Sequence, residues 1–416
     1  MRILFLAHRI PYPPNKGDKI RSYHLLRSLA ERHEVSLLCW ADRESDRRYE
    51  PVLRALCRGG VEILKLNPRI GWLRGLGSLL AGRSFSEGYF FSRRFQRRFD
   101  LRLEKDRYDL IYAFSAPMAR YVPAGSPIPL LMDFVDVDSL KWTQLASFKP
   151  SAFSRFFLLE GKRLARYEMA VAARAKWSLF VSPAEAQLFR SQGASGNILA
   201  LPNGVDFDLF RLPVEADNGS RAPASRPSAK PLRLIFTGTM NYFPNVDAVL
   251  HFSRRILPLI RREYPDVVFD IVGRCPTRPV RRLARSEGIR VAGEVADIRE
   301  HLVRADVSVA PLRLARGVQN KILEAMAMGI PVVATPEAVE GLEVEPGEEL
   351  LVGESPEAFA RQVVALLREP RLRAHIAKRA RARVVQHYSW KRAGLELEAI
   401  LNAGGAAARL AAGRAL

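Results

Sequence analysis

The chain has 416 residues, of which 48% are hydrophobic and 26% are charged, with 27 Gly and 27 Pro. This length and balance are ordinary for a globular protein of two or three domains, and they exclude a disordered, collagen-like or coiled-coil chain. The formal net charge of +21, carried by 53 Arg and 12 Lys, favours anionic partners such as phosphates, nucleic acid or acidic lipid, although Arg dominance also arises from genomic composition bias.

Cysteine content and hydropathy indicate a protein of a reducing compartment. Cys39, Cys57 and Cys275 form no CxxC pair, so neither a disulfide framework nor a structural zinc site is expected. No run of eighteen or more uncharged apolar residues occurs, which argues against a spanning helix. The N-terminal MRILFLAHRIPYPP has an apolar core too short for a signal peptide, so we expect a buried first strand and a cytoplasmic protein.

In the first half of the chain, short apolar runs alternate with longer amphipathic stretches. Residues 2–8 predict a strand, followed by a Pro/Gly loop over 11–17 and a helix from Asp18. Further strands are predicted over 34–40, 61–66, 109–114 and 129–134. These runs are continuously apolar, as strands covered on both faces should be, so they predict a parallel α/β sheet.

The segment 213–231 is rich in Ala, Ser, Pro and Gly and predicts a linker between two domains. After it, strands and helices alternate again, with expected strands at 232–238, 267–273, 306–312 and 331–335 and helices at 245–263 and 320–328. Three helical stretches follow, the last beginning near Trp390, and a tail over 403–416 is expected to fray. The pattern predicts two doubly wound α/β domains, 1–212 and 232–388, with the ligand in a cleft between them, and a final segment over 389–416.

The densest functional signal is the run RGVQNKILEAMAMGIPVVATPEAVEGL over residues 316–342. A glycine-containing loop enters a helix near Val318, and the start of a helix offers unpaired N–H groups suited to phosphate. Arg316 and Lys321 add positive charge there, and Glu324 lies one helical turn further on, where a carboxylate can accept two hydrogen bonds from a ribose diol. The plainer interpretation is a solvated helix with one Lys–Glu pair.

A second group of polar residues follows a predicted strand of the first domain. Asp133, Asp136 and Asp138 lie at its carboxyl end, where parallel sheets place functional residues. Carboxylates ~4 Å apart repel, which can raise one pKa enough for acid–base chemistry. A divalent metal site is the rival hypothesis, and helix capping by Asp138 is another. His8, after the first strand, is either a polar site residue or a packed strand-end histidine.

Residues 72–99 interleave Trp, Leu and Phe with Arg. This combination predicts an interfacial segment that meets anionic lipid headgroups, and the alternative is a pair of ordinary amphipathic helices packed on the domain.

Several motifs together resemble a known family. EAMAMGIPVVAT resembles the signature of the retaining, nucleotide-sugar-dependent glycosyltransferases of GT-B fold. LPNGVDFDLF, FTGTMNYFPNVDAV, IVGRCP and HYSW resemble further family motifs in the family's order, so the resemblance covers nearly the whole chain. DFVDVDSLKW, FTGTMNYFPN and ARGVQNKILEAMA also resemble the sugar transferases associated with exosortase/PEP-CTERM exopolysaccharide systems.

The resemblance implies a GT-B fold of two Rossmann-like domains, with the acceptor side in 1–212, the nucleotide sugar in 232–388 and a crossover helix and tail in 389–416. It implies transfer of a hexosyl unit, with retention, from a nucleotide diphosphate sugar to a glycan or lipid-linked acceptor, with no metal and no cofactor beyond that donor. The implied donor-binding residues are Gly17, Gly238, Thr239, Asn245, Gly293, Val295, Arg316, Gly317, Val318, Asn320 and Glu324. The catalytic residues expected here are Lys321 and Arg274, which would stabilise the charge on the leaving diphosphate, and Asp136, the strand-end carboxylate that is the candidate for acid–base chemistry.

The sequence departs from the family pattern at informative positions. The motif usually has two glutamates eight positions apart; Glu324 matches the second, but Arg316 occupies the first, which contacts the transferred sugar in relatives. The usual Arg/Lys pair after the first strand of the second domain is also missing, and Lys321 and Arg274 are the candidates to replace its charge.

The alternatives are a catalytically degenerate nucleotide-sugar-binding protein, a nucleotide-sugar epimerase and a basic nucleic-acid-binding protein. A nucleic-acid partner is not expected, because no recognised nucleic-acid module occurs. Peripheral contact with the inner face of an anionic membrane would suit a lipid-linked acceptor.

Overall fold

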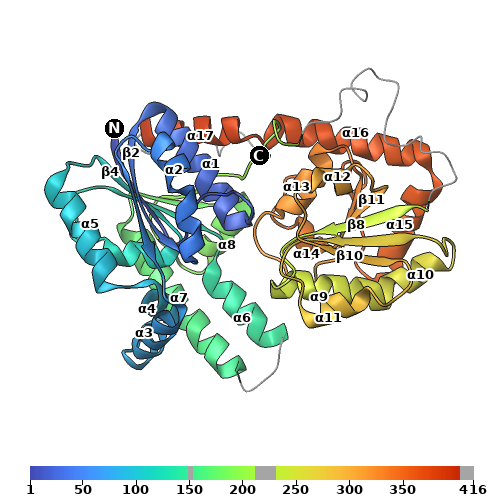
Figure 1. Cartoon of the computed structure of the whole chain (residues 1–416), viewed down its shortest axis with the longest axis horizontal. Coiled ribbons are helices and arrows are strands. Elements are labelled where there is room, and N and C mark those ends of the chain that lie inside the picture. Colours follow the sequence, from blue (N-terminus) through green and yellow to red (C-terminus); the bar gives the residue numbers. More distant parts are fainter. Residues whose placement is uncertain (149–152, 211–230, 403–416) are drawn as a thin grey trace. The chain divides into compact units, whose positions relative to one another are not determined.

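A computed structural model of the chain describes residues 1–148, 153–210 and 231–402. Most of the predicted linker and the predicted tail lie outside the described residues. The chain divides into two compact units (Figure 1): unit 1 comprises Met1–Pro202 and the C-terminal residues from Ala393, and unit 2 comprises Asn203–Arg392.

Unit 1 contains a seven-stranded parallel sheet in the order β3-β2-β1-β4-β5-β6-β7. The strand order reverses at β1, and its neighbours β2 and β4 pair with it in parallel register. The interior strands are buried almost throughout, as their continuous apolar runs require. The strands are β1 (Arg2–Ala7), β2 (Glu34–Ala41), β3 (Val61–Lys65), β4 (Leu110–Phe114), β5 (Leu130–Val135), β6 (Trp177–Phe180) and β7 (Ile198–Ala200).

Helices connect these strands and pack on the sheet (Figure 1). They are α1 (Gly17–Arg32), α2 (Glu50–Leu56), α3 (Pro68–Leu80), α4 (Phe85–Phe90), α5 (Arg93–Lys105), α6 (Asp138–Phe148), α7 (Ser154–Arg174) and α8 (Pro183–Ser191), with 3₁₀ turns η1 (Glu44–Tyr49) and η2 (Ala116–Tyr121). The last helix of the chain, α17 (Trp390–Asn402), belongs to unit 1 from Ala393 on.

Unit 2 has a six-stranded parallel sheet in the order β10-β9-β8-β11-β12-β13, with the same reversal at its first strand, β8. Its strands are β8 (Arg233–Thr237), β9 (Val268–Val272), β10 (Ile289–Gly293), β11 (Val307–Ala310), β12 (Val332–Ala334) and β13 (Leu351–Val352). Its helices are α9 (Phe243–His251), α10 (Leu257–Arg261), α11 (Arg278–Leu283), α12 (Arg299–Leu302), α13 (Asn320–Ala327), α14 (Pro336–Val339), α15 (Pro356–Arg368) and α16 (Pro370–His387). The expected doubly wound α/β architecture is confirmed in both units.

The structure differs from the sequence expectation in two places. The helix expected over 245–263 is confirmed over 243–261, but between α9 and α10 it contains a π turn, η4 (Phe252–Ile256), just before Pro258, which has no N–H to continue the α-helical hydrogen bonds. The segment 72–99 is not one surface stretch: Phe85, Phe95 and Phe99 are buried, and only its first helix, α3, exposes large apolar side chains.

Candidate functional site

Three neighbouring strands of unit 2 end in glycine. Gly238 follows β8, Gly273 follows β9 and Gly293 ends β10, and all three have positive φ. A Cβ on Gly273 would overlap the carbonyl oxygen of Gly238, so the backbones after β8 and β9 meet at a distance that only glycine permits. A Cβ on Gly293 would meet nothing within 4 Å, so space is open beside it. This edge offers bare backbone to a ligand at the carboxyl ends of the strands.

Asn245 and Lys321 close this edge from two helices. Asn245, in the first turn of α9, donates from Nδ2 to the carbonyl of Thr239 at 3.1 Å. Its Oδ1 accepts a 2.6 Å hydrogen bond from Nζ of Lys321, in the first turn of α13. The same Nζ lies 4.6 Å from the ring centroid of Phe236 in β8, a cation–π distance. The predicted donor-binding residues Gly238, Thr239 and Asn245 and the predicted catalytic residue Lys321 therefore form one contact cluster.

Burial shifts the pKa values of Lys321 and Glu324, two ionisable residues of α13. It lowers the pKa of Lys321 to about 7, against the opposing charge of Glu324. It raises the pKa of Glu324 to about 7, against the opposing charge of Lys321. Within the described residues, no donor hydrogen-bonds to the Glu324 carboxylate, so both of its oxygens can accept bonds from a ligand. The predicted solvated Lys–Glu ion pair does not form, since Lys321 turns to Asn245 instead.

The loop before α13 is more extended than the sequence indicated. The helix begins at Asn320 rather than near Val318, because Gly317 has φ 61° and Gln319 is extended. A Cβ on Gly341 would overlap the Gly317 carbonyl, so this loop packs on the backbone that follows α14. The Arg316 side chain is largely buried, with Nη1 3.5 Å from Oε1 of Glu340.

The remaining predicted residues of unit 2 lie around this cluster. The carbonyl of Arg274 accepts from Met240 N at 2.8 Å, which holds the loops after β8 and β9 together. Val295 is partly buried and packs against the core of unit 2. Asn320 accepts a 3.1 Å hydrogen bond from Asn203, a buried residue that sequence reasoning did not single out. The motif LPNG, which contains Asn203, is the sequence feature that could have indicated this residue.

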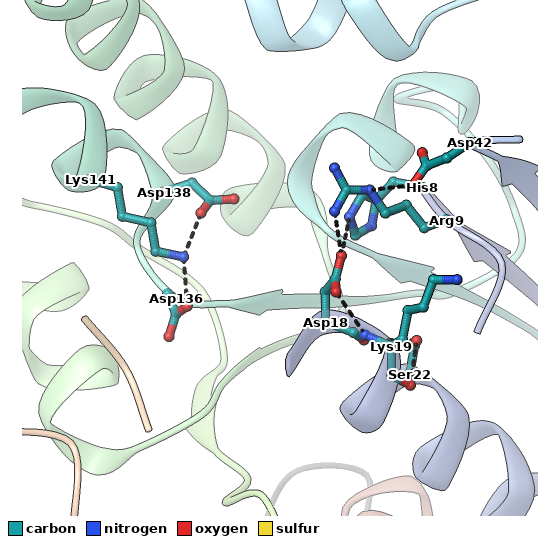
Figure 2. Close-up of polar contacts among 9 residues, drawn as sticks. All are labelled: His8, Arg9, Asp18, Lys19, Ser22, Asp42, Asp136, Asp138 and Lys141. Carbon is teal, nitrogen blue, oxygen red and sulfur yellow. Dashed lines mark hydrogen bonds and ion pairs between the residues drawn. The ribbon is translucent and has the colours of Figure 1, made fainter. Parts of the chain in front are cut away.

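Unit 1 presents a charged cluster where β1 ends and α1 begins (Figure 2). Gly17 begins α1, and Asp18 lies 2.8 Å from Nη1 of Arg9 and 3.5 Å from Nε2 of His8. Although burial alone would raise it, the hydrogen bond from His8 and the charge of Arg9 hold the pKa of Asp18 well below its usual range. The His8 ring stacks on Phe114, so His8 is a packed strand-end residue that also keeps a polar contact.

The expected cluster of unpaired, mutually repelling carboxylates in unit 1 is wrong. Figure 2 shows Lys141 between two of them, with Nζ 2.6 Å from Asp136 and 2.9 Å from Asp138. The third, Asp133, is fully buried and pairs with Arg21 at 2.9 Å, while Tyr112 donates to it at 2.7 Å. Asp133 is thus a structural residue. The other oxygen of Asp136, Oδ1, is buried without a hydrogen-bond partner among the described residues.

The predicted residues therefore fall into two groups. Those of the β8, β9 and α13 termini come together in unit 2, whereas Gly17 and Asp136 belong to unit 1. Across the described ranges, no three His, Cys, Asp or Glu side chains converge as ligands for a metal ion. No helix of the described chain is long and apolar enough to cross a bilayer.

Both units match domains found in known proteins. Residues 19–204 match the family described as Glycosyl transferase 4-like domain, and residues 231–369 match Glycosyl transferases group 1. A phosphatidyl-myo-inositol mannosyltransferase of Propionibacterium freudenreichii subsp. shermanii is 32% identical over 157 residues, which is 36% of this chain and 38% of that protein. This chain thus matches little more than a third of the length of that relative.

Solved structures resemble the whole chain. HepE of Anabaena, crystallised with UDP, has a TM-score of 0.68 at 18% identity, covering 97% of this chain and 100% of HepE. Sucrose-phosphate synthase of Thermosynechococcus elongatus has a TM-score of 0.71 at 16% identity, covering 98% of this chain and 100% of that one. The fold is therefore the expected GT-B fold, and the two domain matches support a glycosyltransferase.

Proposed function

We propose that this protein, a GT-B chain whose two units match consecutive glycosyltransferase domains, is a retaining, metal-independent hexosyltransferase that uses a nucleotide diphosphate sugar. We assign its acceptor to the glycan or lipid-linked class, in bacterial exopolysaccharide synthesis of the exosortase/PEP-CTERM-associated type. We assign the protein itself to the cytoplasmic face of the membrane. The motifs DFVDVDSLKW and ARGVQNKILEAMA support the narrower assignment.

One observation carries the proposal: a cation, a free carboxylate and three glycine-terminated strands meet at one sheet edge of unit 2. The bare backbone beside Gly293 suits a nucleotide base, and Lys321 suits a diphosphate. Glu324, with unoccupied acceptor oxygens, suits the two hydroxyls of a ribose. The UDP bound to HepE, a structure of the same fold, supports a nucleoside diphosphate as the donor carrier.

In this proposal the protein accelerates transfer by positioning the two substrates and by stabilising the charge that develops on the leaving group. The acceptor hydroxyl attacks the anomeric carbon from the face that the diphosphate leaves, and a phosphate oxygen takes its proton. Lys321 and Arg274 stabilise the charge that develops on the leaving diphosphate. Removing one such donor typically costs roughly 100-fold in rate.

A second candidate function is nucleotide-sugar binding without turnover. It is favoured by Arg316, which occupies the sugar-contacting position of the family motif and lies against Glu340. Measurable transfer to a lipid or glycan acceptor excludes this candidate, and the anomeric configuration of the product, read by NMR, tests retention.

Binding is tested first, by thermal shift with UDP, GDP, ADP and CDP and then by titration of the selected nucleotide. If Glu324 binds the ribose diol, the 2′-deoxy nucleotide binds wild type roughly tenfold more weakly, because one hydrogen bond to a charged group is lost. In Glu324→Gln this difference shrinks.

Glu337→Gln, an exposed change at the start of α14, is the matched control and keeps the full difference. Equal binding of the ribo and deoxy forms by wild type would contradict the role given to Glu324. Absence of a shift with every nucleotide would overturn the donor site itself.

A further inference from the structure

Helix α3 of unit 1 exposes its largest apolar side chains. The exposed fractions are 91% for Leu80, 70% for Leu73 and 54% for Trp72, and Ile70 and Leu76 are about half exposed. At 100° per residue these positions lie on one face of the helix. An ordinary amphipathic helix turns such a face to the core. In α3 this pattern is inverted, because the large apolar side chains face the solvent.

The opposite face of α3 explains how the helix is held. Its buried residues are the small ones, Gly71, Gly75 and Ser78. A Cβ on Gly75 would overlap the Phe85 ring of α4, and one on Gly88 of α4 would overlap Ser78. The two helices thus pack at close range through small residues, which fixes the direction of the large ones.

Helix α7 fastens this pair to the rest of unit 1 and exposes apolar side chains of its own. The Glu160 carboxylate, fully buried, accepts from the N–H groups of Phe85 and Ser86 at the start of α4. Arg163 donates to the carbonyl of Leu79 at the end of α3. On the same first turns of α7, Leu158 and Leu159 are exposed. Figure 1 shows α3, α4 and α7 side by side at one end of the unit.

The exposed charged side chains of α3 and α7 are all positive. Between Glu62 and Glu87 the sequence has no acidic residue, and Glu87 is buried in the cap of α4. On α7, the first acidic residue is the buried Glu160. The exposed charged side chains are all cationic: Arg69 on α3, Arg83 just after it, and Arg155, Lys162 and Arg166 on α7.

We propose that this apolar, cationic surface of α3 and the first turns of α7, here called the α3–α7 surface, docks unit 1 on an anionic lipid bilayer. Leu73, Leu76 and Leu80 enter the headgroup and acyl boundary, and the basic residues pair with lipid phosphates. A second copy of the chain is disfavoured as occupant, because it would bring the same positive charges face to face. The docking is independent of the sugar-transfer reaction, so each is tested without the other.

Flotation with vesicles tests the docking at ~0.05 M and ~1 M salt, using phosphatidylcholine alone or with about a quarter phosphatidylglycerol. Wild type floats with the anionic vesicles and far less with neutral ones or at high salt. The double variant Leu73→Gln/Leu80→Gln binds at least about tenfold more weakly, since two leucines no longer partition. The variant Arg69→Gln/Lys162→Gln loses a similar factor at low salt only.

Matched controls separate docking from folding. Leu101→Gln/Leu395→Gln changes two leucines on α5 and α17 that are about half exposed and lie outside this surface, and it keeps wild-type binding. Because the four leucines are exposed, thermal melting stays unchanged in both double variants. Bound vesicles also shift the emission of Trp72, the exposed tryptophan of α3, to shorter wavelength, and Trp72→Phe removes that shift.

Three results would overturn the proposal. They are no flotation at low salt, equal loss in the control double variant, and a dimer by light scattering that only Leu73→Gln/Leu80→Gln dissolves. The last would assign the surface to a second copy of the chain.

Discussion

Lys321 is buried in a setting that destabilises its positive charge. Its Nζ is hydrogen-bonded to the Asn245 amide and lies over the Phe236 ring, and within the described chain no carboxylate forms an ion pair with it. An amide oxygen and a π face stabilise a cation less than an anion does. The side chain is therefore prepared for an anionic ligand that restores the missing partner.

This setting predicts a pH dependence for nucleotide binding. Because burial brings the pKa of Lys321 to about 7, the free protein loses this proton as the pH rises through neutrality, whereas the complex keeps it. The affinity for the nucleoside diphosphate should therefore fall above pH ~7, by up to about tenfold per pH unit. Titration calorimetry from pH ~6.5 to ~9 measures the slope.

The variant Lys321→Met isolates the cause. It should bind about tenfold to 100-fold more weakly at neutral pH and show a flatter profile above it. Lys378→Met, an exposed change on α16 of the same unit, is the control and keeps the wild-type slope. A slope that persists in Lys321→Met would assign the titration to Glu324, whose pKa burial also brings to about 7.

How far such a site follows from sequence depends on how local its contacts are. Lys321 and Glu324 share a helix, so their spacing alone predicts that both serve one site. The bond from Lys321 to Asn245 spans 76 positions and follows only from the fold, which brings the first turns of α9 and α13 together. Likewise, Asp133 was expected among functional carboxylates because it lies at the end of a strand. Its buried partner Arg21 lies 112 positions away, so their pairing was not predictable from the sequence.

At the scale of elements, the start of α6 depends on a carboxyl group from α7. Glu168 is buried, and its Oε1 accepts from the N–H of Ser139 at 3.2 Å, while its other oxygen and the Ser139 hydroxyl have no partner in the described residues. Burial, with the charge of Asp138 adding to it, raises the pKa of Glu168 to about 8. The α6–α7 contact therefore contains a carboxyl group that is protonated at neutral pH.

This contact predicts that unit 1 loses stability as the pH rises. An unfolded glutamate ionises near pH ~4.3, whereas folded Glu168 keeps its proton to about 8. Between these values the folded state binds more protons than the unfolded state, so the free energy of unfolding falls with rising pH and then levels off. Glu168→Gln, which keeps the acceptor for Ser139, should remove the fall and be more stable than wild type at pH ~8 by about 1 kcal/mol or more.

Urea unfolding of both proteins at pH ~5.5 and ~8 gives the comparison. Glu104→Gln, at an exposed site on α5, should follow wild type at both values. If Glu168→Gln followed wild type as well, the buried carboxyl would not be the group that links folding to pH.

Element boundaries were predictable where composition marks them and not where packing does. Continuous apolar runs located the central strands, since both faces of a parallel sheet are covered. The inversion of α3 was not predictable, because Gly71 and Gly75 reveal their role only beside the side chains of α4. The same composition would have allowed α3 to bury its leucines.

At the scale of the whole molecule, the chain leaves unit 1 at Pro202 and returns to it at Ala393. The returning helix α17 is joined to α1 and its cap: Nε2 of His33 lies 2.9 Å from Glu398, and a Cβ on Gly394 would overlap the Ser28 side chain. Leu397 is fully buried on this helix. The stability of unit 1 therefore depends on residues that are translated after the whole of unit 2.

Two leucines on α17 test this dependence. Leu397→Ala should lower the free energy of unfolding of unit 1 by about 2–5 kcal/mol, because it leaves a cavity in a buried contact. Leu395→Ala, on the same helix but about half exposed, should change it by less than ~0.5 kcal/mol. Hydrogen exchange followed by mass spectrometry assigns the effect: β1, β2 and α1 should exchange faster in Leu397→Ala, while β8, β9 and β11 stay as in wild type. If only the strands of unit 2 exchanged faster, α17 would stabilise unit 2 and not unit 1. If the exchange of both units increased equally in Leu397→Ala, the two units would unfold as one.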